Sequence, residues 1–202
     1  FEGANACLLD IDHGTFPYVT SSNCSALGIH AGTGLPGKYV NEVVGIMKAY
    51  STRVGGGPFP SEELGETGEK IRERGNEYGT TTGRPRRCGW LDLVAVKYSA
   101  MICGTTSIAC MLLDVLSGFD ELFICVGYKL PDGTLSNRFV PDARLLAEAK
   151  PVYEKLSGWH EEIDDVTSPD DLPDNAKAYL DFISEYLGLP ISIVSVGPKR
   201  SQ

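Results

Sequence analysis

With 202 residues, of which 42% are hydrophobic and 22% charged, the chain is long enough to bury a core and has the composition of a globular protein. The formal net charge of −9 argues against nucleic acids and membranes as partners, because anionic surfaces are bound by clustered Lys and Arg. No apolar run approaches the roughly 20 residues that cross a bilayer, so we predict a soluble protein with the cytoplasm as its default compartment.

The first predicted element is an amphipathic helix over residues 38–50, where apolar residues from Val40 to Met47 recur at i, i+3, i+4 and i+7. The same spacing predicts a helix over 89–102. Residues 108–116 then form an apolar run with few polar residues, which is typical of a buried strand.

A third apolar run, 122–130, leads into the turn residues 131–133 and predicts a hairpin whose second strand lies within 134–140. Residues 173–187 are predicted to be helical, because a proline stands near the start and a glycine follows the end. A buried strand over 191–197 completes the pattern. We therefore predict an α/β fold, part of a larger mixed sheet with flanking helices and an antiparallel hairpin.

Cysteine spacing favours free thiols over disulfides. The six cysteines form no CxxC pair, and several lie in apolar stretches, which is typical of buried thiols in a reducing compartment. The start at Phe1 without Met and the end on GPKRSQ suggest cuts through a longer protein. The acidic residues within 161–171 are expected to form a solvated surface loop.

The segment GTTTGRPRR, residues 79–87, carries the strongest signal for a binding site. Arg84, Arg86 and Arg87 crowd within four residues of an acidic chain, and like charges this close repel unless an anion joins them. Glycine amides, threonine hydroxyls and guanidinium groups all bind carboxylates or phosphates. The alternative is an exposed basic turn; the preceding GTTTG favours a site for a small anionic ligand.

Two weaker signals lie elsewhere. Small polar side chains in VTSSN, residues 19–23, could line a polar pocket, although by themselves they suit a turn equally well. Asp10, Asp12 and His13 could suggest a metal or an acid/base pair, but no further ligands lie near them in sequence, so we expect a structural role. No metal site is predicted in this chain.

Asp114 is expected at the carboxyl end of the strand 108–116, where ligands of open α/β sheets bind. A carboxylate there can accept the N1–H and N2–H₂ of guanine. A helix cap or a surface aspartate is an equally good interpretation. The chain contains no GxxxxGK[ST] or GxGxxG motif and no plausible Ser-His-Asp set, so we predict no catalytic acid or base in it.

Several motifs together resemble one known family over essentially the whole chain. FEGANA, LDIDHGTFPYVTSSN, KAYSTRVGGGPFP, GTTTGRPRRCGWLDL, LLDVL and SVGP occur in the order found in adenylosuccinate synthetases. ANA after FEG resembles the eukaryotic branch. The resemblance implies that residues 1–202 are the C-terminal portion of a P-loop-like synthetase domain without its N-terminal phosphate-loop half. It also implies a homodimeric, Mg²⁺-dependent ligase of purine biosynthesis that joins L-aspartate to IMP at the expense of GTP.

The resemblance carries site residues over motif by motif. It implies three groups of ligand-binding residues: Asn5, Thr20 and Arg84 for IMP; Thr80, Thr81, Thr82, Gly83, Arg84, Pro85 and Arg86 for aspartate; Arg86, Leu112, Leu113, Asp114, Ser195, Val196 and Gly197 for GTP. The family's catalytic aspartate and histidine belong to the absent half, as do most of the Mg²⁺ contacts. The fragment is therefore expected to be inactive alone.

Two positions depart from the family pattern. Leu112 stands where the family usually has lysine, which puts some nucleotide affinity in doubt, and Pro85 replaces a basic residue between two arginines. Two other classes stay open: a stand-alone carboxylate- or nucleotide-binding module, and a structural α/β domain with an incidental basic turn.

Overall fold

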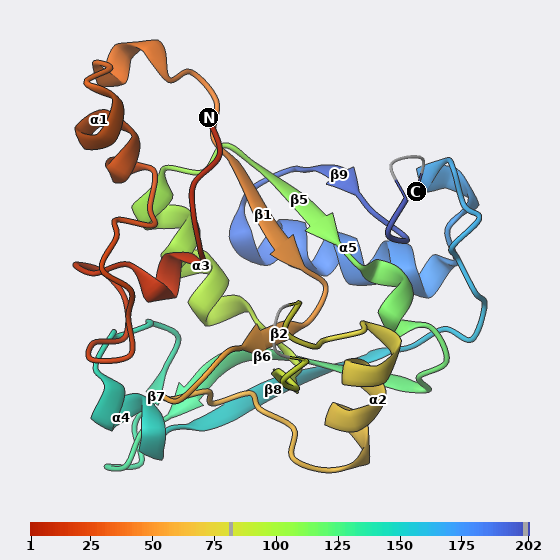
Figure 1. Cartoon of the computed structure of the whole chain (residues 1–202). Helices are drawn as coiled ribbons and strands as arrows, with labels where there is room; N and C mark the ends of the chain where they lie inside the picture. The colour runs from red at the N-terminus through yellow and green to blue at the C-terminus, as the bar shows by residue number, and fades with distance from the viewer. Residues whose placement is uncertain (81–82, 200–201) are drawn as a thin grey trace.

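Two β-sheets, a two-stranded ribbon and the helices beside them make up the fold (Figure 1). The computed structural model describes residues 1–80, 83–199 and 202. Its helices are α1 Leu27–Thr33, α2 Glu66–Arg74, α3 Leu93–Cys103, α4 Ala143–Glu148 and α5 Asp174–Leu187, with short 3-10 helices η1 Cys7–Leu9, η2 Gly37–Tyr39, η3 Leu113–Leu116 and η4 Pro169–Asp171. Its strands are β1 Val44–Lys48, β2 Ser51–Arg53, β3 Arg87–Gly89, β4 Leu91–Asp92, β5 Ser107–Met111, β6 Glu121–Lys129, β7 Leu135–Ser136, β8 Lys150–Ser157 and β9 Ile191–Val194.

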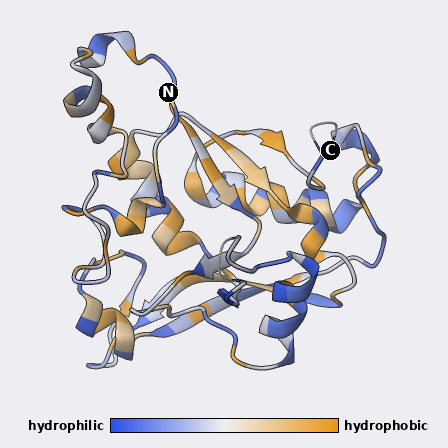
Figure 2. Ribbon diagram, viewed as in Figure 1, coloured by the Kyte–Doolittle hydropathy of each residue, from blue (hydrophilic) through white to orange (hydrophobic). Residues whose placement is uncertain are grey.

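The first sheet is parallel, with the strand order β1-β5-β9. Ile46 pairs with Ala109, and Cys110 pairs with Val194. The central strand is buried over Ile108–Cys110, as expected for a strand flanked on both edges, and its apolar character is visible in Figure 2. Helices α3 and α5 contact each other, and α3 also contacts β1.

The second sheet is mixed. Strand β6 pairs in parallel with β4 and antiparallel with β7 and β8. The predicted hairpin is confirmed: the Leu130 amide donates to the Thr134 carbonyl at 2.8 Å across a turn in which Gly133 has a φ of 85°. The returning strand, however, covers only two residues of the predicted 134–140.

Helix α5 is also confirmed. Pro173 occupies its N-cap, and Gly188 ends it in the left-handed conformation with a φ of 67°. Helix α3 begins four residues later than predicted, because residues up to Asp92 form β4. The Asp92 carboxylate then caps the helix by accepting the Ala95 amide at 3.0 Å.

The helix predicted over 38–50 is wrong. Residues 44–48 are β1, and only 37–39 form a short 3-10 helix. The β-branched residues Val44 and Ile46 suit a strand, and pairing with β5 outweighs the helical spacing. Gly45 permits close approach, since a Cβ at this position would lie 2.8 Å from Thr105 Cγ2.

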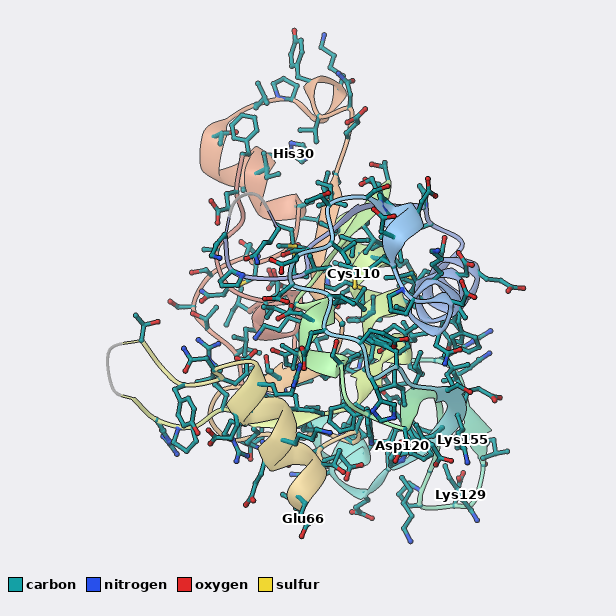
Figure 3. All side chains as sticks on the ribbon, turned by 90° about the vertical axis from the view of Figure 1, so that its right-hand side faces the viewer. His30, Glu66, Cys110, Asp120, Lys129 and Lys155 are labelled. Carbon is teal, nitrogen blue, oxygen red and sulfur yellow. The ribbon has the colours of Figure 1, made fainter. Side chains whose placement is uncertain are left out.

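Both predicted buried strands end early. β5 ends at Met111, because Leu112 adopts the left-handed conformation with a φ of 61° and starts η3, and β9 ends at Val194. Helix α2 and strand β8 lie in segments for which we predicted no element. Part of the glycine-rich segment 28–37 forms α1, which projects from the rest of the molecule in Figures 1 and 3.

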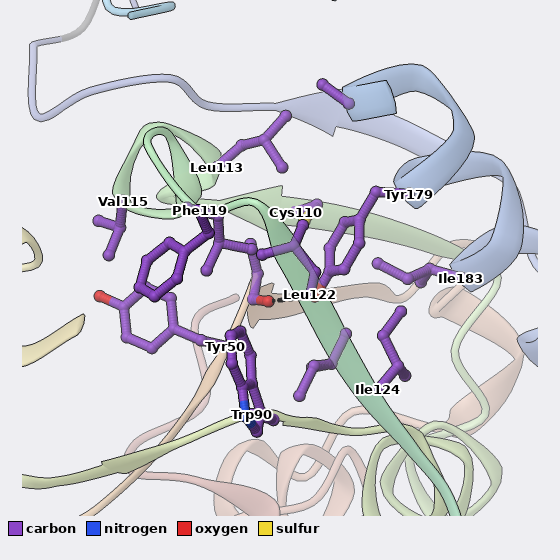
Figure 4. Close-up of a cluster of buried hydrophobic side chains, with 14 of the residues drawn as sticks. Tyr50, Trp90, Cys110, Leu113, Val115, Phe119, Leu122, Ile124, Tyr179 and Ile183 are labelled. Carbon is purple, nitrogen blue, oxygen red and sulfur yellow. Dashed lines mark hydrogen bonds between the residues drawn. The ribbon is translucent and has the colours of Figure 1, made fainter. Parts of the chain in front are cut away.

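The main core lies where the sheets and α5 meet. Cys110, Leu122 and Tyr179 are buried together there (Figure 4), while labelled charged residues such as Glu66 and Lys155 lie at the periphery (Figure 3). All six cysteines are free thiols, as predicted; four are buried, but Cys7 and Cys103 are half-buried. The α/β fold class is confirmed.

Candidate functional site

Two backbone hydrogen bonds close the base of the glycine- and arginine-containing loop, residues 79–87. The Gly79 amide donates to the Arg84 carbonyl at 2.8 Å, and the Arg86 amide donates to the Glu77 carbonyl at 2.9 Å. Gly83 has a φ of 65°, which favours glycine, and its amide donates to the Gly79 carbonyl. Thr80, Gly83, Arg84 and Pro85 are exposed, whereas Thr81 and Thr82 lie outside the described residues. The loop therefore offers polar groups to solvent from a fixed base.

Arg86 is held at this base by a buried carboxylate. Glu77 is 1% exposed, and its Oε2 accepts from Arg86 Nη1 at 2.6 Å. Its Oε1 accepts from Lys48 Nζ at 2.5 Å and from the Tyr50 hydroxyl at 2.6 Å. Burial raises the pKa of Glu77, but these three donors outweigh burial and lower the pKa below its ordinary value.

Arg87 has a different partner. Its guanidinium forms a bidentate ion pair with Glu62 and donates to the Gly57 carbonyl at 2.8 Å. The premise that the crowded arginines need an external anion to lie close together is therefore wrong for Arg86 and Arg87, because each already pairs with a protein carboxylate, although Arg86 shares Glu77 with Lys48. Glu62 and Glu77 lie before the loop in sequence, and the fold brings them to it.

The two segments predicted to bind the guanine lie side by side. The Leu113 amide donates to the Ser195 carbonyl at 3.1 Å, and the Ser195 amide donates to the Cys110 carbonyl at 2.9 Å. The Ser195 hydroxyl donates to the Gly197 carbonyl at 2.9 Å, and Val196 is buried. Parallel pairing of β5 with β9 thus brings residues 112–114 and 195–197 to one edge of the sheet.

We expected Asp114 at the carboxyl end of a strand. This prediction is wrong, because Asp114 lies in the first turn of η3. Its backbone carbonyl accepts from Arg74 Nη2 at 3.1 Å. Its Oδ1 is buried and has no hydrogen-bond partner within the part of the chain that the structure describes. Burial raises the pKa of this carboxyl group. A buried acceptor without a donor is suited to a ligand N–H.

The N-terminal segment is folded around Asp10, which is fully buried. Its carboxylate accepts four backbone amides, those of Asp12, His13, Cys24 and Ser25. The predicted structural role of Asp10 is therefore confirmed. Thr20 is fixed near this turn, since its amide donates to the Leu9 carbonyl at 2.8 Å, and Asn5 has a φ of 63° and contacts the Cys24 thiol.

One side chain connects this segment to the arginine loop. Arg53 Nη2 donates to the Thr15 hydroxyl at 3.1 Å, and Arg53 pairs with Arg87 in the β2–β3 ribbon. The segments that carry Thr20 and Arg86 are therefore joined through one short ribbon.

Lys48, Tyr50 and Glu77 were not predicted as site residues. Glu77 could have been noticed, because it is the one acidic residue within the segment GNEYGTTTGRPRR. Lys48 and Tyr50 carry no such signal, since only the β1–β2 turn brings them to Glu77.

A pocket of about 440 Å³ lies elsewhere, between the 57–62 segment and α4. Its lining includes Tyr18, Phe59, Arg87 and Leu146; apart from Arg87 of the 79–87 segment, it includes none of the residues that the sequence analysis assigned to a ligand. In the described ranges, no group of three or more His, Cys, Asp or Glu residues could hold a metal ion. Among the same residues, none of the helices combines the length and the hydrophobicity that a membrane-spanning segment needs.

The mixed sheets and flanking helices place the chain among α/β proteins. More narrowly, it belongs to the adenylosuccinate synthetase family, whose model matches residues 1–202. It is 54% identical to the adenylosuccinate synthetase of Alkaliphilus metalliredigens over 202 residues, and 52% identical to that of Aquifex aeolicus over 204 residues. Each alignment covers all of this chain and 47% of the relative, so the chain spans about half the length of the curated relatives it matches.

Solved structures give the same family. The fully ligated adenylosuccinate synthetase from Plasmodium falciparum superposes with a TM-score of 0.95 at 47% identity, covering 98% of this chain and 48% of that one. The succinoaminodeoxyadenylate synthetase of cyanophage S-2L, at 17% identity and a TM-score of 0.57, shares the fold.

Proposed function

We propose that the complete protein containing this chain joins L-aspartate to IMP with GTP, giving adenylosuccinate, GDP and phosphate. Identity of 54% over the whole chain to an adenylosuccinate synthetase is the observation that carries this proposal. In this reaction GTP phosphorylates the 6-oxygen of IMP, and the aspartate amine then displaces that phosphate. The protein would act in AMP biosynthesis as a cytoplasmic homodimer.

Residues 1–202 are assigned to the C-terminal portion of the enzyme, with the phosphate-loop half outside this chain. The residues ANA after FEG support a eukaryotic-like origin, although the bacterial relative at 54% identity is more similar in sequence than the Plasmodium enzyme at 47%. The chain alone is proposed to be inactive, because phosphoryl transfer requires electrostatic stabilisation by the phosphate loop.

In the proposed site, the loop Thr80–Arg86 binds the two carboxylates of aspartate. Glycine amides, hydroxyls and guanidinium groups on a loop with a hydrogen-bonded base are suited to binding these anions. Asn5 and Thr20 contact IMP, Thr20 through the 5′-phosphate, and Arg84 lies between IMP and aspartate. Both IMP residues stand beside the Asp10 turn, whose four backbone hydrogen bonds fix the segment.

Asp114 is proposed to read guanine, accepting its N1–H and N2–H₂. The unpartnered buried Oδ1 supports this role, and Leu112, Leu113 and residues 195–197 would pack around the base. Mg²⁺ is the cofactor that the family implies, and the resemblance assigns most of its ligands to the phosphate-loop half. This chain's own contribution is to bind and orient substrates.

The test is an assay of the complete protein with IMP, aspartate and GTP. Adenylosuccinate and phosphate formed in equal amounts, with ATP unable to replace GTP, are expected. Absence of adenylosuccinate would contradict the proposal. Calorimetric titration of this chain alone addresses the alternative class: tight binding of one ligand, with no turnover by the complete protein, would indicate a binding module.

A further inference from the structure

We propose that Glu77 is a positioning residue for aspartate binding, which holds the Arg86 guanidinium in one orientation while Lys48 and Tyr50 hold Glu77. This inference rests on the proposed function and extends the site to three residues outside the loop. Arg86 is the residue through which Glu77 acts.

Glu77 restrains Arg86 at both ends. The Arg86 amide donates to the Glu77 carbonyl at 2.9 Å, and Arg86 Nη1 donates to Oε2 at 2.6 Å. A further contact fixes the backbone, because Arg72 Nε of α2 donates to the Arg86 carbonyl at 2.9 Å. An arginine tied at its backbone and at one terminal nitrogen retains little rotamer freedom, so ligand binding costs less conformational entropy.

The other side of the guanidinium is suited to a carboxylate. The Arg86 side chain is 31% exposed, and its Nε is buried without a hydrogen-bond partner in the described part of the chain. Because Glu77 uses Nη1, the edge formed by Nε and Nη2 is the one that can bind both oxygens of a carboxylate. A buried donor without an acceptor favours a ligand that brings one.

Charge also favours an anion here. Glu77 is one carboxylate shared by two cations, Lys48 and Arg86. This group of three side chains therefore carries one net positive charge. Tyr50 adds a neutral donor to the same carboxylate, at Oε1, whereas Arg86 donates to Oε2. In a partly buried site, one uncompensated positive charge attracts a carboxylate more strongly than it would in water.

The experiment is Glu77→Gln in the complete protein, with steady-state kinetics for each substrate. The amide cannot accept from all three donors, so we expect the KM for aspartate to rise on the order of tenfold. The KM for IMP should change less than about twofold, because the Asn5 and Thr20 segment does not contact Glu77. In an Arg86→Lys background, Glu77→Gln should have no further effect on the aspartate KM, since the fork on which it acts is already lost.

Glu62→Gln is the matched control, because it breaks the ion pair of the neighbouring Arg87. The aspartate KM of this variant should stay at the wild-type value. If Glu77→Gln does not fold, Tyr50→Phe, which removes one hydrogen bond to Glu77, should raise the aspartate KM by about two- to threefold.

Three outcomes would overturn the inference: an unchanged aspartate KM in the folded Glu77 variant or in Tyr50→Phe, equal effects on IMP and aspartate, or additive effects with Arg86→Lys. If the wild-type protein forms adenylosuccinate, any of these outcomes contradicts only the role of Glu77. A wild-type protein with no turnover overturns the proposed function, and this inference with it.

Discussion

The hydroxyl group of Tyr128 donates a 2.6 Å hydrogen bond to Asp92 Oδ2 inside the protein, where both side chains are at most 5% exposed. The other carboxylate oxygen caps α3. Burial raises the pKa of Asp92 to about 6, although Tyr128 and the helix amides lower it in part. The chain therefore keeps a costly charge at neutral pH beside a small cluster of buried side chains that includes Val94, Cys125 and Leu146.

We predict that Asp92→Asn raises the free energy of unfolding relative to wild type, and that this gain is larger at pH 7 than at pH 4. Between about pH 4 and 6 the folded wild type binds a proton that the unfolded chain does not, so its stability falls as pH rises through this window. Asparagine removes the charge; its side-chain oxygen can still accept the Ala95 amide, while its NH₂ group donates to the Tyr128 oxygen, and the shift in pKa corresponds to about 3 kcal/mol. Denaturant unfolding at several pH values would measure this, and a pH-independent difference between the two proteins would contradict it.

Asp114→Asn is expected to raise the KM for GTP at least about tenfold, while those for IMP and aspartate change little. An amide can accept one guanine N–H but presents its own donors to the other, which leaves an unfavourable contact. Steady-state kinetics of the complete protein with GTP and with ITP measure the effect. ITP lacks the N2 amino group, so wild type should lose affinity for it more than the variant does. Equal GTP and ITP constants in wild type would argue against the role of Asp114.

Leu112→Lys is expected to lower the KM for GTP by about threefold to tenfold. The resemblance to the family places a lysine at this position, beside the guanine, where its stem covers the base and its ammonium group adds a donor. Leu112→Met, which restores a flexible stem without charge, is the control and should have little effect. No change with lysine would mean that neighbouring residues compensate for Leu112.

Cys103 is expected to be the most reactive thiol at pH 7. Its sulfur lies 3.9 Å from that of Cys7, and a hydrogen bond with Cys7 lowers the pKa of Cys103 below its ordinary value despite burial. Burial raises the pKa of Cys110 to about 12, so this thiol serves as an internal control. Iodoacetamide labelling followed by peptide mass spectrometry should find Cys103 modified first, and Cys7→Ala should slow it. Faster labelling of Cys110 would contradict the prediction.

The sequence allowed prediction of elements whose ends carry their own chemical signals. Pro173 and Gly188 bound α5, and Gly133 makes the hairpin turn, so both were found without tertiary information. The helix over 38–50 failed because Val44–Lys48 satisfies a helical and a strand pattern alike, and pairing with β5 decides between them. Local patterns cannot include a partner strand that lies far away in the chain.

The same limit applies to the candidate site. GTTTGRPRR marked the loop, but the carboxylates that pair with Arg86 and Arg87 are brought to it only by folding. Likewise, residues 112–114 and 195–197 were grouped through the family resemblance, whereas their contact arises from the parallel pairing of β5 with β9. Residue types in the loop predicted a site for anions, whereas the residues that contact the loop could be identified only from the fold.

Strand β1 pairs with β5 along one edge, and no described strand lies against its other edge, where Val44 and Ile46 are 44% and 74% exposed. Open amides and carbonyls beside exposed aliphatic side chains form a template for any extended segment nearby. A preparation of this chain by itself should therefore self-associate as its concentration rises. If the proposed function holds, the same edge makes the chain a candidate for split-enzyme complementation, in which the proposed phosphate-loop half is supplied as a separate polypeptide and adenylosuccinate formation is measured.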